Sequence, residues 1–155
     1  MTKKLIIAIL LFFAFSSCGF KPLNQIEKNN YFVNNINSEG EKRIAYFLKE
    51  KILLNSKSNA KNKFNINLKI KKDKEIKEKK ISGKISSYKV ILNVILLIED
   101  IENSKKISNN FIKSTAYNVA NNHSDTLTNE KKATELLTEG ISDDITNFLI
   151  IYLNR

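Results

Sequence analysis

One cysteine, Cys18, is the residue whose type and place most clearly indicate a chemical reaction. Lys3 and Lys4 precede an apolar run of eleven residues that ends at Phe15, and two serines separate this run from Cys18. A basic start, an apolar stretch and small residues make up the layout of an export signal. Because the chain has no second cysteine, its thiol is available for acylation and not for an internal disulfide. We therefore expect cleavage before Cys18 and a lipid-anchored mature protein.

The apolar run is too short for a comfortable membrane span. As a helix it measures about 16 Å at about 1.5 Å per residue, whereas the apolar core of a bilayer is about 30 Å thick. Two alternatives stay open, namely a plain secretory signal followed by a chance cysteine, and a short buried helix. The residues before Cys18 resemble the bacterial lipobox and depart from it at Phe15, where leucine is usual. Gly19 replaces the aspartate that retains lipoproteins in the inner membrane, so this resemblance implies the outer membrane, periplasmic face.

A run of lysines is the second candidate for chemistry, because ammonium groups bind phosphates as mobile point charges. The run comprises Lys71, Lys72, Lys74, Lys77, Lys79, Lys80 and Lys84. Asp73, Glu75 and Glu78 lie between these lysines and partly cancel their charge. A solvated loop is the alternative interpretation, because Lys, Asn and Ile are abundant and only two basic residues are Arg, as A/T-rich codons would give.

Enzymatic chemistry has little support in the sequence. The sole histidine, His123, lies between Asn121 and Asp125 in a stretch that predicts a solvated loop before a helix. Its neighbours Ser124 and Asp125 are too close in sequence to fold back into a catalytic triad. The chain has no cluster of thiols and histidines for zinc and no glycine-rich phosphate loop. We expect neither an enzyme nor a bound cofactor.

Length and charge limit the remaining classes. The sequence predicts a signal peptide over residues 1–17, a lipidated tether over 18–30 and one domain over 31–155. Loss of Lys3 and Lys4 with the signal lowers the net charge from +10 to +8. A basic surface fits nucleic acid, anionic lipid or phosphorylated sugar. Export to the periplasm argues against nucleic acid.

The first half of the domain predicts a strand followed by a helix. Residues 31–36 form a short strand, and Ser38 with Glu41 has the spacing of a capping box. Apolar residues at helical spacing then continue to Ile52, and the helix should end near Asn55.

Three strands and a long helix follow. Apolar and polar residues alternate strictly over 64–70, which predicts a half-buried strand. The charged stretch 71–84 predicts a solvated hairpin connection, with extension of the strand into it left open. Residues 85–99 and 107–119 predict two more strands, the first of them central or covered on both faces because 94–98 are all apolar. Apolar residues from Ala133 to Tyr152 predict the final helix. Three consecutive antiparallel strands with two helices on one face make an α+β sandwich.

This order of elements, with two local stretches, resembles the LptE family, the LPS-assembly lipoproteins of the outer membrane. Residues 18–23 read Cys-Gly-Phe-Lys-Pro-Leu, similar to the Cys-Gly-Phe-Arg-Pro-Leu opening of the alphaproteobacterial branch. The second stretch runs from Ala116-Tyr117-Asn118-Val119 through Glu130 to Tyr152 and is similar to that branch's last strand and final helix. Ser124 departs from the pattern, which tends to carry an aromatic residue there.

The resemblance implies a fold and a non-enzymatic role. The fold is two helices packed on one face of a four-stranded sheet, in the order β-α-β-β-β-α, with residues 31–36 supplying the fourth strand. LptE proteins plug the LptD β-barrel, assist its assembly and bind the lipopolysaccharide that it delivers to the cell surface. We therefore expect a one-to-one complex with an LptD-like barrel, polar residues such as Asn65, Asn67 and Asn118 suited to its wet lumen, and lipopolysaccharide at the lysine run.

Two other classes compete with this expectation. A lipid-anchored periplasmic carrier of a ligand or lipid, without a barrel partner, should contain a large apolar cavity, whereas a plug should have a filled core. A lipid-anchored hydrolase would need a nucleophile and a base brought together by the fold.

Overall fold

The structure, a computed structural model, describes residues 31–60 and 62–153. The predicted signal 1–17 and tether 18–30, with Cys18, lie outside the described residues. The elements are β1 (Tyr31–Gly40), α2 (Lys42–Leu54), β2 (Asn62–Lys79), β3 (Ile85–Asp100), β4 (Lys106–Asn118) and α3 (His123–Leu153). Their order, β-α-β-β-β-α, is the predicted one.

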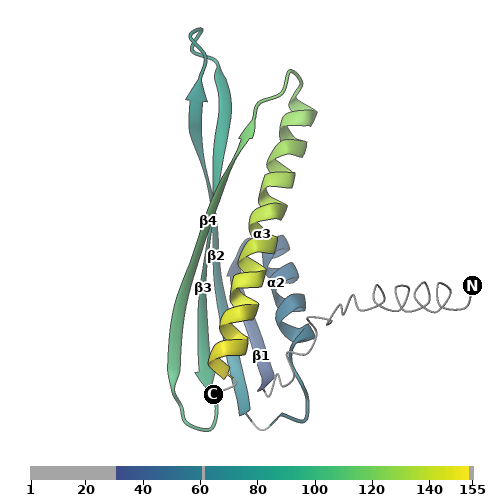
Figure 1. Cartoon of the computed structure of the whole chain (residues 1–155), viewed down its shortest axis with the longest axis vertical. Coiled ribbons are helices and arrows are strands. Elements are labelled where there is room, and N and C mark those ends of the chain that lie inside the picture. The colour runs from purple at the N-terminus through teal and green to yellow at the C-terminus, as the bar shows by residue number, and fades with distance from the viewer. Residues whose placement is uncertain (1–30, 61, 154–155) are drawn as a thin grey trace, which may run out of the picture.

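The four strands form one sheet in the order β1-β2-β3-β4. β2, β3 and β4 are antiparallel neighbours, while β1 pairs in parallel with β2 because α2 carries the chain back between them. Both helices lie on the same face of this sheet (Figure 1), α2 against β1 and β2, and α3 against β3 and β4. The predicted α+β sandwich with two helices on one face is confirmed.

The predicted capping box at the start of α2 is wrong. Ser38 lies within β1, whose pairing with β2 continues to Gly40, opposite Ile70. Glu41 is the residue before the helix, and no side chain caps the helix start. Gly40 has φ +100°, and a Cβ there would collide with the carbonyl oxygen of Ile70. The strand therefore runs to the one residue that can both approach β2 closely and redirect the chain into α2.

The charged stretch after Lys71 is mostly strand and not loop. β2 continues to Lys79 in register with β3, interrupted by irregularities around Glu78, and the turn comprises residues 80–84. As Figure 1 shows, this β2–β3 hairpin projects beyond both helices. β3 is central, as predicted, and contributes to the core five buried side chains: Val90, Leu92, Val94, Leu96 and Ile98.

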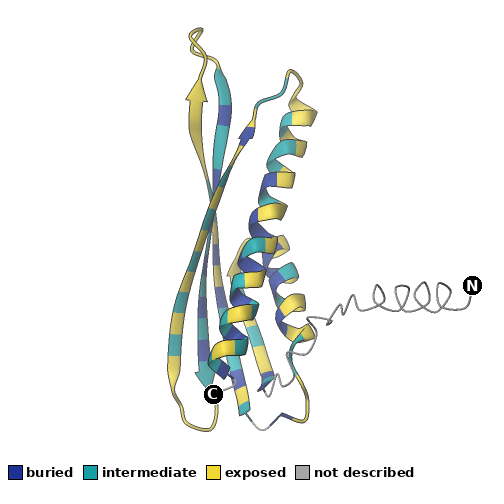
Figure 2. Cartoon of the chain, viewed as in Figure 1, coloured by how far each residue is buried: buried dark blue, intermediate teal, exposed yellow. Residues whose placement is uncertain are grey.

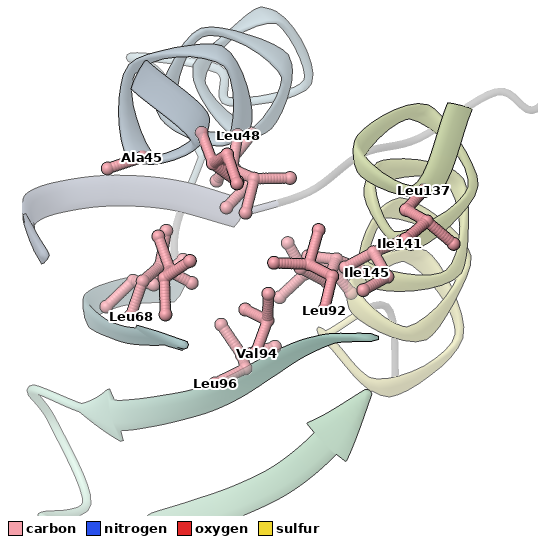
Figure 3. Close-up of a cluster of buried hydrophobic side chains, with 14 of the residues drawn as sticks. Ala45, Leu48, Leu68, Leu92, Val94, Leu96, Leu137, Ile141 and Ile145 are labelled. Atoms are coloured by element: carbon pink, nitrogen blue, oxygen red, sulfur yellow. The ribbon is translucent and has the colours of Figure 1, made fainter. Parts of the chain in front are cut away.

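The core lies between the sheet and the two helices. Buried residues occur on both helices and on the strands that they cover, while the hairpin tip is exposed (Figure 2). Figure 3 shows Leu48 of α2, Leu92 of β3 and Ile141 of α3 pointing into this shared layer, where all three are at most 1 % exposed. Full burial of each such side chain contributes about 1.5–3 kcal/mol. The buried side chains of the sheet and of both helices thus form one hydrophobic core.

The start of α3 has a polar cap that we did not predict. The Oδ1 atom of Asn122 accepts a hydrogen bond from the backbone N–H of Asp125 at 2.7 Å. In return, the Asn122 amide donates to the Asp125 carboxylate at 2.7 Å. Because this pair satisfies free groups at a helix start, α3 begins at His123, inside the stretch that we predicted as loop. The Asn-x-x-Asp spacing is the sequence signal for it.

The two edges of the sheet are protected differently. At the start of β1, the carbonyl of Tyr31 accepts from the N–H of Lys57 at 3.0 Å, and the Ser56 hydroxyl accepts from the N–H of Val33 at 2.9 Å. On β4, the side chain of Lys113 turns toward α3 and pairs with Asp144 at 2.9 Å. Occupied backbone groups and an inward-pointing charge both disfavour pairing with a foreign strand.

Candidate functional site on the lysine-rich hairpin

The pleat of β2 divides the predicted lysine run between different surfaces. Lys72 and Lys74 continue the row of Leu68 and Ile70 on the helix-facing side, and Lys71 faces the opposite side. Lys77 lies at the irregularity beside Glu78, and Lys79 ends the strand. Lys80 and Lys84 belong to the turn, which the Lys80 N–H closes by donating to the Lys84 carbonyl at 2.8 Å. The seven lysines therefore do not form one continuous surface.

The two helix-facing lysines converge on Glu130 of α3. The ammonium of Lys74 donates to the Glu130 carboxylate at 2.9 Å, and Lys72 lies 3.5 Å from its other oxygen. The Tyr117 hydroxyl of β4 donates to the same carboxylate at 2.9 Å. Lys74 also lies 4.9 Å from the ring centroid of Tyr88, which stacks on Tyr117. We call Lys72, Lys74, Tyr88, Tyr117 and Glu130 the Glu130 cluster.

The pKa values of three groups in the Glu130 cluster are shifted by their contacts with one another and by burial. Burial alone would raise the pKa of Glu130, but hydrogen bonds from Lys74 and Tyr117, with the charge of Lys72, lower it. The hydrogen bond to Glu130 raises the pKa of Lys74, and burial raises that of Tyr117 with help from the same carboxylate. The single negative charge of Glu130 therefore offsets part of the positive charge of Lys72 and Lys74 within the fold.

The remaining lysines differ in how free they are. Lys71 pairs with Asp73 at 2.9 Å, and Lys77 lies 3.7 Å from Glu78. Lys79, Lys80 and Lys84 form no ion pair with any residue that the structure describes. These three lysines surround Ile81, whose side chain is fully exposed at the turn. We call Lys79, Lys80, Ile81 and Lys84 the hairpin tip, and it is the part of the predicted run that is free to bind an anion.

The most important residue that sequence reasoning missed is Glu130. It lies 56 residues from Lys74 along the chain, and only the docking of α3 over the sheet brings the two together. For Tyr88 and Tyr117, the sequence predicts strand positions but not their place beside Glu130. A carboxylate on the helix face nearest a lysine-rich strand was the available signal, but the register of α3 on the sheet was not known.

Two hollows flank the Glu130 cluster. A groove of about 560 Å³ lies between α2 and α3, where Tyr46, Phe47 and Leu127 are joined by charged residues such as Arg43 and Glu135. A smaller hollow of about 260 Å³ reaches from Tyr88 to the start of α3. Both are lined by mixed apolar and charged side chains, unlike the large apolar cavity expected of a lipid carrier.

The stretch around His123 forms the start of α3 and its cap. Asp125 bonds to Asn122 and thus serves the helix cap. No group of three or more His, Cys, Asp or Glu side chains in residues 31–60 and 62–153 could hold a metal ion. Among the same residues, no helix is both long and apolar enough to cross a membrane.

Comparisons with known proteins find relatives by structure only. No protein-family model and no curated protein sequence matches the chain. A candidate lipoprotein from Caulobacter crescentus superposes with a TM-score of 0.57 at 14 % identity, covering 79 % of this chain and 90 % of that one. The rare lipoprotein B of Shewanella oneidensis gives a TM-score of 0.52 at 12 % identity, covering 78 % and 94 %. The chain therefore has the fold of these bacterial proteins, which include rare lipoprotein B.

Proposed function

We propose that this chain is an outer-membrane lipoprotein that plugs an LptD-like β-barrel, assists its assembly and helps deliver lipopolysaccharide to the cell surface. The observation that carries the proposal is the fold shared with rare lipoprotein B across most of both chains. Cys18 behind its apolar run supplies the predicted site of acylation, and three acyl chains would hold the protein firmly. The role is non-enzymatic and needs no cofactor.

The uncovered face of the sheet suits the lumen of a water-filled barrel. No helix covers this face in the described chain, and it carries polar residues that include Asn35, Asn65, Asn67 and Asn110. Asn34 donates to the side chain of Asn65 at 3.1 Å, which ties β1 to β2 on the surface. Ile95 and Leu97 of β3 lie between these amides on the same face. The amides can exchange hydrogen bonds with barrel side chains or with water between them.

The hairpin tip is the part that we assign to lipopolysaccharide. Its three lysines are free to meet phosphates, and Ile81 adds an apolar contact. Lys72 and Lys74, which the sequence placed in the same group, hold α3 instead. The proposed contact therefore narrows from seven lysines to Lys79, Lys80 and Lys84, with Lys71 and Lys77 at its margin.

A carrier without a barrel partner is the second candidate. The groove between α2 and α3 favours it, because Phe47 and Leu127 offer apolar surface to a bound molecule. The groove's charged walls weigh against a purely lipid cargo.

Purification from detergent-solubilised outer membranes separates these functions. A tagged full chain should recover one large barrel protein in one-to-one ratio. A chain with Cys18→Ala, exported by another signal, controls for the lipid anchor. Recovery of the chain without a barrel under mild detergent contradicts the plug and favours the carrier.

Binding to purified lipopolysaccharide tests the hairpin tip. Replacing Lys79, Lys80 and Lys84 with Glu should weaken binding at least about tenfold, with a salt-dependent difference. Replacing Lys42, Lys49 and Lys132 with Glu is the matched control, since it makes the same change in charge on the helices. Equal affinity of the two triple variants contradicts the assignment.

A further inference from the structure

At one end of the fold, several helices and strands start or finish together with Tyr31, the first described residue after the tether that carries Cys18. Tyr31 opens β1 there, opposite Asn62 of β2, and its carbonyl binds Lys57 behind α2. The β3–β4 turn joins the same end, where the N–H of Ile101 donates to the carbonyl of Lys63 at 3.0 Å. α3 also finishes at this end (Figure 1). We call residues 53–57, 62–63, 100–105 and 151–153, with Tyr31, the anchor end.

The anchor end exposes an unusual share of apolar surface. Ten large apolar side chains are exposed in the described chain, and four of them lie here: Leu54 (78 % exposed), Ile151 (65 %), Leu53 (46 %) and Ile101 (41 %). They come from α2, α3 and the β3–β4 turn, so no single helix face accounts for them. Single exposed apolar residues need no explanation, but a group at one end indicates a surface that meets an apolar partner.

Positive charge accompanies these apolar residues. The exposed side chains of Lys57, Lys63 and Lys105 form no ion pair with the described residues. Two acids, Asp100 and Glu102, lie in the same turn, so the anchor end has three lysines against two carboxylates, a net charge of +1. Asp100 accepts from the backbone N–H groups of Glu102 and Asn103 and from the Asn103 amide. Hydrogen bonding from Asn103, chiefly, lowers the pKa of Asp100 and keeps its charge directed into the turn. The anchor end therefore presents lysines and aliphatic side chains together, the chemistry that binds an anionic lipid surface.

We propose that the anchor end docks on the anionic lipid surface in which Cys18 is anchored. The proposal rests on the acylation of Cys18 in the proposed function, and not on the barrel. Cys18 lies thirteen residues before Tyr31, so the tether can span at most about 45 Å. This limit keeps the anchor end near the membrane and raises its effective concentration there.

The hairpin tip lies at the opposite end of the molecule and serves as a comparison for lipid contact. β2 carries the chain from the anchor end to the hairpin tip over eighteen residues, roughly 55 Å at about 3.3 Å per residue. A domain that rests on its anchor end therefore holds the hairpin tip away from that lipid surface. Both ends are basic, but only one of them should contact the membrane.

A tryptophan reporter distinguishes the two ends, because the chain contains no tryptophan. The full lipidated chain with Leu54→Trp or Ile81→Trp is reconstituted into vesicles of phosphatidylethanolamine and phosphatidylglycerol with brominated acyl chains. We expect strong quenching of the Leu54→Trp variant and little quenching of the Ile81→Trp variant. Changing Lys57, Lys63 and Lys105 to Glu should reduce the Leu54→Trp quenching, whereas the same change at Lys79, Lys80 and Lys84 should not.

Two results overturn the proposal. Quenching of the Ile81→Trp variant alone would place the hairpin tip on the membrane, and no quenching of either variant on vesicle-bound protein would leave the anchor end in solvent. A second measurement does not depend on acylation: co-sedimentation of the mature chain with Cys18→Ser onto phosphatidylglycerol vesicles, with phosphatidylcholine vesicles as reference. Each lysine at an anionic surface raises partitioning about fivefold, so the Lys57, Lys63 and Lys105 variant should lose at least about tenfold. Equal binding to both lipids also overturns the proposal.

These experiments separate failure of the inference from failure of the proposed function. A chain that is not acylated can bind the vesicles of the first experiment only through its protein surface, and the second experiment measures that binding directly. A missing barrel partner changes neither measurement.

Discussion

The ammonium group of Lys74 in β2 lies 2.9 Å from the carboxylate of Glu130 in α3, which also accepts the Tyr117 hydroxyl. This contact joins α3 to β2 and β4. Replacing Glu130 with Gln should lower the free energy of unfolding by about 1–2 kcal/mol, because hydrogen bonds to a charged group are lost. Urea unfolding of both proteins measures the difference. The matched control is Glu135→Gln, whose exposed contacts with Arg43 and Lys131 contribute little; an equal effect of both changes contradicts the prediction.

The Glu130 cluster should also stabilise the fold over a defined pH window. The pKa of Glu130 is lowered below its ordinary 4.5, so its contribution is complete above pH 4.5 and is lost as pH falls through the folded-state value. The pKa values of Lys74 and Tyr117 are raised above 10.5 and 10.0, so their contributions are complete below those values and are lost as pH rises further. The difference in unfolding free energy between the natural chain and Glu130→Gln should therefore be greatest between about pH 5 and 9. A difference that grows as pH falls below 4 would contradict this assignment.

Gly40 should tolerate substitution much less than Gly83, although both have positive φ. A Cβ at Gly40 collides with the Ile70 carbonyl, whereas a Cβ at Gly83 in the turn meets no atom within 4 Å. Gly40→Ala should therefore cost about 3 kcal/mol or more, and Gly83→Ala only about 1 kcal/mol, from the left-handed conformation alone. Thermal unfolding of the two variants gives the comparison. Similar melting temperatures would mean that β1 can move away from β2 at little cost.

Gly140 should be a position where alanine stabilises the protein. A Cβ there would lie 3.2 Å from the Cδ of Lys113, a flexible side chain that can shift while keeping its pair with Asp144. Alanine in a helix interior is favoured over glycine by about 1 kcal/mol. Gly140→Ala should therefore raise the free energy of unfolding by about 0.5–1 kcal/mol in urea titration. A loss of stability would show that Lys113 is held rigidly against α3, and Lys113→Ala combined with Gly140→Ala would then restore it.

The sequence predicts this fold well wherever one face of an element is apolar. Alternation over 64–70 and the helical period from Ala133 to Tyr152 predict elements that the structure contains. The prediction is incomplete for residues 71–79, because Lys72 and Lys74 occupy positions where an apolar residue would have signalled strand. Their partner Glu130 is distant in sequence, so the pattern itself could not reveal that the strand continues.

The candidate functional site likewise combines features that neighbouring residues reveal with features that depend on residues distant in sequence. The lysine run is visible in the sequence, but its separation into compensated and free members depends on Glu130 and on the pleat of β2. The wrong capping box has a similar cause, since Ser38 and Glu41 have the right spacing but β1 pairs with β2 as far as Gly40. The real helix cap, Asn122 with Asp125, depends on neighbouring residues alone and could have been found.

The parallel pairing of β1 with β2 limits the order in which the chain can fold as it emerges from a ribosome or a translocon. β1 appears first, yet Tyr31 can pair only when Asn62 follows it, 31 residues later. β2, β3 and β4, in contrast, pair with their immediate neighbours in sequence as consecutive hairpins, which close short loops and form quickly. Residues 31–33, with two aromatic side chains and a valine, thus remain unpaired until β2 has been delivered. This first strand is the segment of the domain that a holding chaperone would need to shelter.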